Sequence, residues 1–257
     1  MDLGPLLPGA VVIADIIYLS SNLLGGMMRL ISLNLWYGEK LEDVGKFITS
    51  HIEQTDIFCF QETQGTEAML GRLIDAEKFS FREVKKSASE DYSLRTYIRN
   101  NIEIISVTEL IKEPFEEGSA LAMELVVGDV PLAVVNVHGV PQPGDKLDTP
   151  SRIRQSEAVI DFLEDRRGIS RVVCGDFNLI PTTESIEMFE RSGYKNLIKD
   201  HRIPTTRNEL AWAKYPDNKQ LFADYTFVSE DVKVNQFVVP NILISDHLPM
   251  ILDFDLV

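Results

Sequence analysis

The stretch 175–178, GDFN, decides the fold of this chain together with the stretch 245–249, SDHLP. Each follows a short apolar run, RVVC at 171–174 and VVPNILI at 238–244, and we interpret both runs as buried strands. The polar groups of the two stretches therefore lie where strands end and loops begin. Strand ends that feed loops are where a rigid scaffold displays catalytic side chains, so we expect a functional site there.

Four more polar strings stand at apparent strand boundaries. LNLW at 33–36, QE at 61–62 and NVHG at 136–139 each end an apolar run, and ADY at 223–225 opens one. Aspartate, asparagine and histidine together suit metal-assisted attack on phosphorus. A carboxylate can orient or deprotonate water, an amide can hydrogen-bond without adding charge, and an imidazole can stabilise or protonate phosphoryl oxygens.

The apolar periodicity predicts further helices and strands along the chain. The expected helices cover 39–54, 67–78, 149–167 and 183–191. The expected strands cover 79–84, 92–99, 102–111, 120–127, 132–138, 171–174, 225–228, 232–239 and 250–254. Runs of adjacent strands favour antiparallel pairing, and strand blocks with flanking helices favour two packed sheets with helices outside. No linker interrupts residues 28–257, which indicates one domain.

Composition limits the partners and the compartment. The 257 residues carry a formal net charge of -15, which favours solubility and opposes unaided binding to polyanions. A nucleic-acid binder usually shows a basic stripe, whereas this chain has only small basic clusters. The two cysteines, Cys59 and Cys174, lie in apolar runs. We therefore expect reduced core residues and a cytoplasmic protein.

Residues 1–26 need a separate interpretation. They are mostly apolar, and no Lys or Arg precedes Arg29, so the basic region of a secretory signal is missing. The longest apolar piece, 10–19, contains Asp15 and is too short to span a bilayer. We expect no stable membrane insertion and an N-terminal extension, which a misassigned start codon would explain, before a domain at 27–257. The alternative is a segment that associates weakly with membranes.

In their order, the polar strings between Asn34 and His247 closely resemble the endonuclease/exonuclease/phosphatase superfamily. That order is Asn, Gln-Glu, His, Gly-Asp-x-Asn, Asp and Ser-Asp-His. The superfamily contains DNase I-like and exonuclease III-like metal-dependent phosphoesterases. The resemblance implies an α+β fold, a four-layer αββα sandwich of two packed mixed sheets flanked by helices, with the site at one end of the sheets.

The resemblance also implies a metal site. Glu62 would be the primary ligand of Mg²⁺ or Mn²⁺, since a hard cation takes one or two carboxylates and keeps several waters. Asn34 would orient a metal-bound water or a phosphate oxygen, and Asp246 would ligate or neighbour the metal. Exonuclease III-like members often carry an acidic residue two positions after this Asn, where this chain has Trp36. One metal ion and two both remain open, and two would make Asp176 a ligand.

The remaining site residues receive catalytic roles from the same resemblance. Asp176 would orient or deprotonate the attacking water, and Asn178 would hold the phosphate. His247 would contact the phosphoryl oxygens, while Asp224 would accept its other ring N–H. His138 would assist the leaving group, as in DNase I-like and deadenylase-like branches.

Two arginines are the expected substrate-binding cations: Arg152, in the first turn of a predicted helix, and Arg207. We therefore predict a hydrolase that cleaves phosphodiester bonds with metal-positioned water, a nuclease acting on ends or short single strands. One alternative is a phosphatase or phosphodiesterase for small phosphoesters, namely inositol phosphates, lipids or nucleotides. The alternative from another class is a non-catalytic binding module. The partner is a phosphoester, with nucleic acid one candidate, and the oligomeric state is left open.

Overall fold

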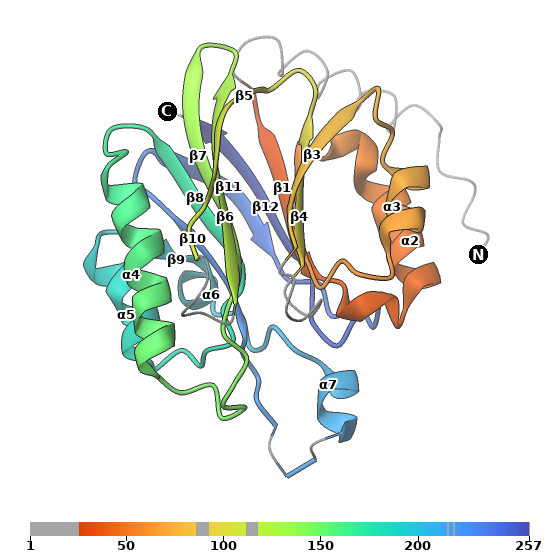
Figure 1. The fold of residues 1–257 in the computed structure, drawn as a ribbon, viewed down its shortest axis with the longest axis vertical. Coiled ribbons are helices and arrows are strands. Elements are labelled where there is room, and N and C mark those ends of the chain that lie inside the picture. The colour runs from red at the N-terminus through yellow and green to blue at the C-terminus, as the bar shows by residue number, and fades with distance from the viewer. Residues whose placement is uncertain (1–25, 86–92, 112–117, 215, 218, 257) are drawn as a thin grey trace, which may run out of the picture.

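Two sheets of six strands each pack face to face, and helices cover their outer faces (Figure 1). The computed structural model describes residues 26–85, 93–111, 118–214, 216–217 and 219–256. The expected α+β sandwich of two mixed sheets flanked by helices is confirmed. Its strands form where the sequence runs apolar on both faces, as in Ser170–Asp176, which is buried throughout.

The first sheet contains strands from both ends of the chain. Its members are β1 Met28–Asn34, β2 Ile57–Gln61, β3 Phe79–Val84, β4 Leu94–Arg99, β11 Val232–Val238 and β12 Met250–Leu256. Their order is β11-β12-β1-β2-β4-β3, and only β1 and β2 pair in parallel. Arg29 on β1 donates to both carboxylate oxygens of Asp253 on β12, at 2.6 and 2.7 Å, which ties the two strands together.

The second sheet comes from the middle of the chain. Its members are β5 Glu103–Glu109, β6 Ser119–Val127, β7 Val130–His138, β8 Ser170–Asp176, β9 Lys195–Asn196 and β10 Asp224–Val228. Their order is β5-β6-β7-β8-β10-β9, and only β7 and β8 pair in parallel. Each sheet is therefore mixed, with one parallel pair at its centre.

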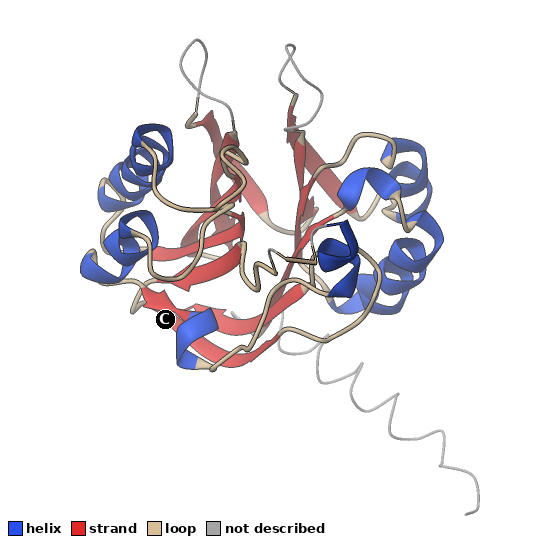
Figure 2. Cartoon of the chain, turned by 90° about the horizontal axis from the view of Figure 1, so that it is seen from below, coloured by secondary structure: helices blue, strands red, loops and turns tan. Residues whose placement is uncertain are grey.

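Helices lie on both outer faces of the sandwich, as Figure 2 shows from one end. The described helices are α2 Leu41–His51, α3 Glu67–Leu73, α4 Pro150–Glu164, α5 Glu184–Arg191, α6 Leu197–Asp200 and α7 Glu209–Lys214. α2 and α3 cover the first sheet, and α4 and α5 cover the second (Figure 1). α4 starts as predicted, because the Thr149 side chain accepts a hydrogen bond from the Arg152 amide and Pro150 occupies the first turn.

The main core fills the space between the sheets and continues between the second sheet and its helices, and a smaller one lies between the first sheet and its helices. Cys59 on β2 and Cys174 on β8 are buried, free thiols in the main core, as expected. Burial raises the pKa of the Cys59 thiol well above its usual range, so this thiol is inert in the folded protein.

Some expected elements are wrong. Residues 239–244 form no strand: β11 ends at Val238, and Pro240, which lacks an N–H, lies in a loop where its carbonyl accepts from Ile242. The helix expected over 67–78 ends at Leu73, since the carboxylate and carbonyl of Asp75 form a turn. The pattern also missed the short elements β9, α6 and α7.

None of the described helices is both long and apolar enough to cross a bilayer. The interpretation of the N-terminal extension falls on residues 1–25, outside the described part of the chain.

Candidate active site

Strand register gathers the predicted site residues of the second sheet at one edge. β8 ends at Asp176, whose partner on the parallel strand β7 is His138. On the other side, the partner of Asp176 on β10 is Asp224. An imidazole and a second carboxylate therefore flank Asp176 because of backbone pairing alone.

Two glycines permit this close approach. A Cβ on Gly175 would lie 2.0 Å from the Val137 carbonyl oxygen, and the φ of Gly175 is +134°. A Cβ on Gly139 would lie 2.3 Å from the Phe177 carbonyl oxygen. Both contacts are far inside van der Waals distance, so only glycine fits at either position. This steric requirement explains why the GDFN and NVHG strings contain glycine at these positions.

The first sheet contributes Asn34, at the end of β1, and Glu62, directly after β2. The Asn34 amide donates to Asp176 Oδ2 at 3.1 Å, which links the sheets at the site. Glu62 has a φ of 50°, a left-handed conformation that is uncommon for residues with a side chain and clusters at functional sites. Its Oε1 lies 3.6 Å from His138 Nε2. The two sheets therefore meet in one cluster of polar groups.

A buried amide pair joins the sheets near this cluster. Gln61 Nε2 donates to Asn136 Oδ1 at 2.7 Å, and the Asn136 amide donates to Thr96 Oγ1 at 3.1 Å and to the Phe60 carbonyl at 3.3 Å. Buried hydrogen bonds of this kind specify one arrangement of the sheets. Both residues stand in the predicted strings, but their structural role was not foreseen.

His247 and Asp224 form the predicted pair. His247 Nδ1 lies 3.0 and 2.9 Å from the two Asp224 carboxylate oxygens. Its Nε2 lies 3.7 Å from Asp176 Oδ2 and 3.8 Å from Asp246 Oδ1. Burial opposes the charged ring, but Asp224, Asp246 and Asp176 outweigh it and raise the pKa of His247 to about 9. The imidazole is therefore a cation at neutral pH.

The pKa values of two carboxyl groups in the site are shifted in opposite directions. Burial opposes ionisation of Asp176, but His247 and Lys146 outweigh it and lower the pKa of Asp176 to about 2. Burial raises the pKa of Glu62 to about 7, although His247 acts in the other direction. Environments that separate two carboxyl pKa values in this way are typical of catalytic sites.

Three hydrogen bonds hold Asn178 in place. Its backbone N–H donates to Asp176 Oδ1 at 2.9 Å, and its side-chain amide donates to the Gly139 carbonyl at 3.1 Å. Its Oδ1 accepts a hydrogen bond from Lys146 Nζ. Lys146, which is only 5% exposed, was missed by sequence reasoning. A lone lysine in a loop rich in Pro, Gly and Asp carries no signal that could have identified it.

The two expected substrate-binding arginines differ. Arg152 is fully buried, and its guanidinium donates to the carbonyls of the loop 140–147, namely Val140, Pro141, Pro143 and Leu147. This geometry does not favour a contact with substrate, because four of the five N–H donors are already used and Nη1 also lies 3.5 Å from Asp145 Oδ1. Arg207 Nη2 donates to Asp246 Oδ2 at 2.8 Å, and its backbone forms a β-bridge with His247. Arg207 therefore lies at the site, and its role in substrate binding stays a prediction.

The donor set fits a divalent cation. Ligand atoms of Glu62, His138 and Asp176 all lie within 4.8 Å of one another. The partly buried carboxylate of Glu62 would be stabilised by a cation, and hard cations prefer such oxygens. A second group, Asp176, Asp224 and His247, is equally close but is occupied by its internal hydrogen bonds. Asp246 belongs to neither group, so its role as a metal ligand stays a prediction, as does that of Asn34.

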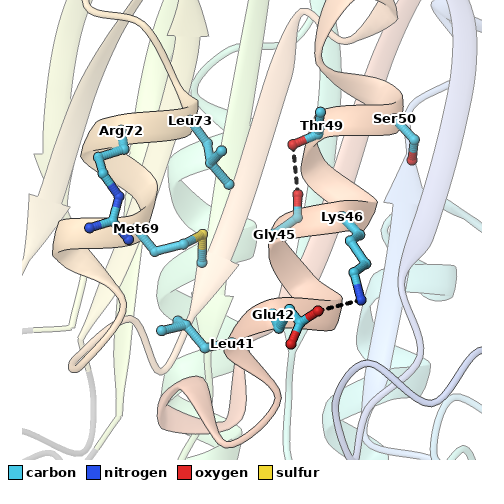
Figure 3. Close-up of a pocket in the computed structure, with 9 residues that line it drawn as sticks. All are labelled: Leu41, Glu42, Gly45, Lys46, Thr49, Ser50, Met69, Arg72 and Leu73. Atoms are coloured by element: carbon cyan, nitrogen blue, oxygen red, sulfur yellow. Dashed lines mark hydrogen bonds and ion pairs between the residues drawn. The ribbon is translucent and has the colours of Figure 1, made fainter.

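A separate groove of about 670 Å³ lies between α2 and α3 on the outside of the first sheet (Figure 3). Its lining includes Leu41, Met69 and Leu73, and Lys46 pairs with Glu42 at 2.6 Å on its rim. The groove contains none of the predicted site residues, so its size alone gives it no part in phosphoester chemistry.

The chain belongs to the Endonuclease/Exonuclease/phosphatase family, whose sequence model matches residues 19–247. Members of this family are hydrolases of phosphoester bonds that depend on a divalent metal, and this protein is accordingly such a hydrolase. No curated protein sequence matched the chain.

Solved structures share its fold. The human Nocturnin catalytic domain has a TM-score of 0.70 at 17% identity, covering 90% of this chain and 95% of that one. A mannosyl-6-phosphatase of Bacteroides thetaiotaomicron has a TM-score of 0.70 at 15% identity, covering 88% and 99%. D. rerio TDP2, humanized by 14 mutations, has a TM-score of 0.68 at 16% identity, covering 89% and 99%. At these identities the similarity shows the fold and leaves the substrate open.

Proposed function

We propose that the protein hydrolyses phosphodiesters, and that its substrates are nucleic-acid ends or short single strands. The observation that carries this proposal is the placement of two imidazoles around one carboxylate. His138 on β7 and His247, held by Asp224 on β10, flank Asp176 on β8. A phosphodiester requires both, because its phosphoryl oxygens need a cationic partner and its alkoxide leaving group needs a proton.

Each side chain then receives a role. Asp176 would orient the attacking water, because a carboxylate with a pKa of about 2 is ionised but only weakly basic. His247, with a pKa of about 9, would donate from Nε2 to a phosphoryl oxygen. Asp224 holds Nδ1 and so fixes the orientation of the ring. His138 would donate a proton to the leaving oxygen.

Glu62 would hold the divalent cation, with Asn34 beside it and Asp246 as a further neighbour, and we propose Mg²⁺ or Mn²⁺. Bound there, the cation would neutralise phosphoryl charge and lower the pKa of a water molecule. The Asn34 amide donates to Asp176, which keeps that carboxylate aligned with the cluster.

The charges at the site favour a short substrate. Arg207 and Lys146 are cations that act on Asp176, and Arg207 is already paired with Asp246. Together they suffice for one or two phosphates, whereas tight binding of long duplex DNA requires many Lys and Arg contacts. The net charge of -15 acts in the same direction.

The first experiment compares bis-p-nitrophenyl phosphate with p-nitrophenyl phosphate, each with Mg²⁺, Mn²⁺ or EDTA. We expect metal-dependent hydrolysis that favours the diester. Preference for the monoester would replace the proposal by a phosphatase acting on small phosphoesters, and activity in EDTA would contradict the metal site.

A variant tests the role of the leaving group. His138→Gln should slow hydrolysis of a dinucleotide by about 100-fold or more, the usual contribution of a general acid. It should affect p-nitrophenyl thymidine 5′-phosphate much less, because nitrophenolate leaves without a proton. Equal losses on both substrates would contradict a proton donor at this position.

The substrate class is tested with matched single-stranded, duplex and dinucleotide substrates across a salt series at fixed Mg²⁺. We expect the single strand and dinucleotide to be preferred, with weak salt dependence. Submicromolar duplex binding with a steep salt slope would indicate a duplex endonuclease instead.

We also propose a cytoplasmic location. The two free thiols, Cys59 and Cys174, support a reducing compartment, although burial alone would protect them. Cell fractionation tests this directly, and recovery in a secreted or membrane fraction would contradict it.

A further inference from the structure

Lys146 is a buried cation that has no direct ion-pair partner among the described residues. The residue is 5% exposed, and its ammonium has three N–H donors. The one acceptor that the described part of the chain gives it is the neutral Asn178 Oδ1. Burial lowers the pKa of Lys146, which reflects the cost of keeping this charge away from water. A buried charge that carboxylates compensate only from beyond ion-pair distance is expensive, so a reason for keeping it should lie nearby.

The surroundings of Lys146 point to the reaction centre. Asn178, which accepts from its ammonium, also donates its backbone N–H to Asp176 Oδ1 at 2.9 Å. Asp176, Asp224 and Arg207 all act electrostatically on Lys146. The ammonium therefore lies one side chain away from the carboxylate around which the site is built.

The loop that carries Lys146 is rigidly held. Arg152 donates to four of its carbonyls, and the Ile180 amide donates to the Lys146 carbonyl at 3.0 Å. Asp148 accepts from the backbone amides of Glu184 and Ser185 at 2.6 and 3.1 Å. These contacts support a φ of 59° at Lys146, a conformation that costs energy and persists only where the surroundings impose it.

Both ends of the Asn178 amide are engaged by these contacts, which leave it one N–H donor. Its Nδ2 donates to the Gly139 carbonyl, and its Oδ1 accepts from Lys146. The role of holding the phosphate, which the sequence assigned to Asn178, therefore suits Lys146 better. An ammonium offers charge and two further donors to an anionic oxygen, whereas this amide is neutral and offers one further donor.

We propose that Lys146 is a substrate-binding residue that contacts a phosphoryl oxygen, and that Asn178 is a positioning residue that acts through Lys146. The inference rests on the proposed phosphodiester hydrolysis and names the group that binds the phosphate. It also gives Arg152 a purpose, since Arg152 holds the loop that presents the ammonium.

The test uses inorganic phosphate as the probe, because its binding does not depend on which phosphoester is the natural substrate. Titration calorimetry in Mg²⁺ would compare the wild type with Lys146→Met, Asn178→Ala and the double variant. The control is Lys78→Met, which removes an exposed lysine that pairs with Glu53. We expect Lys146→Met to weaken phosphate binding by about 10- to 100-fold, the usual worth of a charged hydrogen bond. Lys78→Met should change nothing.

Asn178→Ala should weaken phosphate binding by a similar factor, and the double variant should be no weaker than Lys146→Met. Additive losses would overturn the positioning role. Lys146→Met should also melt at the same temperature as the wild type or higher, because an unpaired buried charge is removed; a lower melting temperature with unchanged phosphate affinity would show a merely structural lysine.

Kinetics separate this inference from the proposed function. With a phosphodiester substrate, Lys146→Met should raise KM or lower kcat/KM by a similar factor. Wild-type turnover together with unchanged phosphate binding in the variant would overturn the role of Lys146 alone. Absence of diester hydrolysis in the wild type, with Lys146-dependent phosphate binding intact, would overturn the proposed function alone.

Discussion

Glu62 combines a left-handed backbone, a side chain that is 14% exposed and a carboxyl pKa of about 7, and these features suit a group that binds a cation. Its folded-state pKa is raised from 4.5, so the folded protein binds the proton more tightly than the unfolded chain does. This contribution favours folding at low pH and is lost as the pH rises through about 7. Above that pH, Glu62 therefore destabilises the metal-free protein.

Glu62→Gln should therefore both inactivate the enzyme and stabilise the metal-free protein against unfolding. Activity should fall by about 100-fold or more, because the ligand charge is lost. At about pH 8 with EDTA, the free energy of unfolding should rise by on the order of 3 kcal/mol, since each pKa unit is worth about 1.4 kcal/mol. At about pH 5 the gain should largely disappear. Urea unfolding at both pH values measures this.

The control for this comparison is Glu77→Gln, which neutralises an exposed carboxylate. It should change neither activity nor stability beyond a few tenths of a kcal/mol. Near wild-type turnover of Glu62→Gln at limiting Mg²⁺ would remove Glu62 from the metal site.

His247 and Asp224 should act as one unit, because the Asp224 carboxylate contacts Nδ1 at 2.9 Å and holds the ring in place. Once either is changed, the other has lost its purpose, so the effects of His247→Ala and Asp224→Asn on turnover should not add. A double-mutant cycle on kcat measures the coupling. Strictly additive losses would show that the two residues work independently.

Sequence reasoning reached most of these residues because each stands in a polar string at a strand end. It did not reach Lys146, because the position of this side chain depends on hydrogen bonds from Arg152 to the loop 140–147 and not on a recognisable motif around Lys146. It also assigned Arg152 to substrate, because a helix N-terminus suggests phosphate binding, while the structure turns its guanidinium inward.

At the scale of elements, the two glycines at the ends of β7 and β8 govern how closely these strands and their loops approach. Gly175→Ala places a methyl 2.0 Å from the Val137 carbonyl oxygen in a backbone conformation that alanine avoids. We expect a loss of stability of about 3 kcal/mol or more, in the range of severe single substitutions. Thermal and urea unfolding measure it.

The chain offers a matched control in Gly71, on α3, where an added Cβ meets no atom within 4 Å. Gly71→Ala should stabilise the protein by about 0.5–1 kcal/mol, because alanine favours the helix. A tolerated Gly175→Ala would mean that β7 and β8 separate more easily than their register indicates.

Long periodic elements could be predicted, and short ones could not. Apolar runs identified most strands to within a few residues, whereas α6 and α7 are too short to show a helical period. The run 238–244 is apolar but forms no strand beyond Val238, because Pro240 has no N–H to pair with a neighbouring strand. Apolar periodicity alone does not take this effect into account.

At the scale of the whole molecule, the N-terminal extension should be dispensable. The first strand of the domain begins at Met28, and every predicted site residue follows it. A chain that starts at Met27 should therefore keep its melting temperature and its turnover. An insoluble or inactive product, beside a healthy full-length protein, would show that residues 1–26 pack into the domain.

The sandwich architecture followed from the family resemblance and from the alternation of strand blocks and helices. The strand order did not, because β1 pairs with β12 across more than two hundred residues of sequence, as the Arg29–Asp253 ion pair illustrates. Local pattern carries no information on such pairings, which depend on how the finished sheets pack.

Because β1 lies between β2 and β12, the first sheet can be completed only late in the synthesis of the chain. A ribosome delivers β1 among the earliest elements, yet its neighbour β12 emerges after every other strand. His247, three residues before β12, arrives equally late. Throughout translation the growing polypeptide thus carries an open sheet and lacks its imidazolium cation. Non-local pairing of this kind is slow, so catalytic competence should appear only after β12 has emerged, and until then the unpaired edge of β1 favours aggregation.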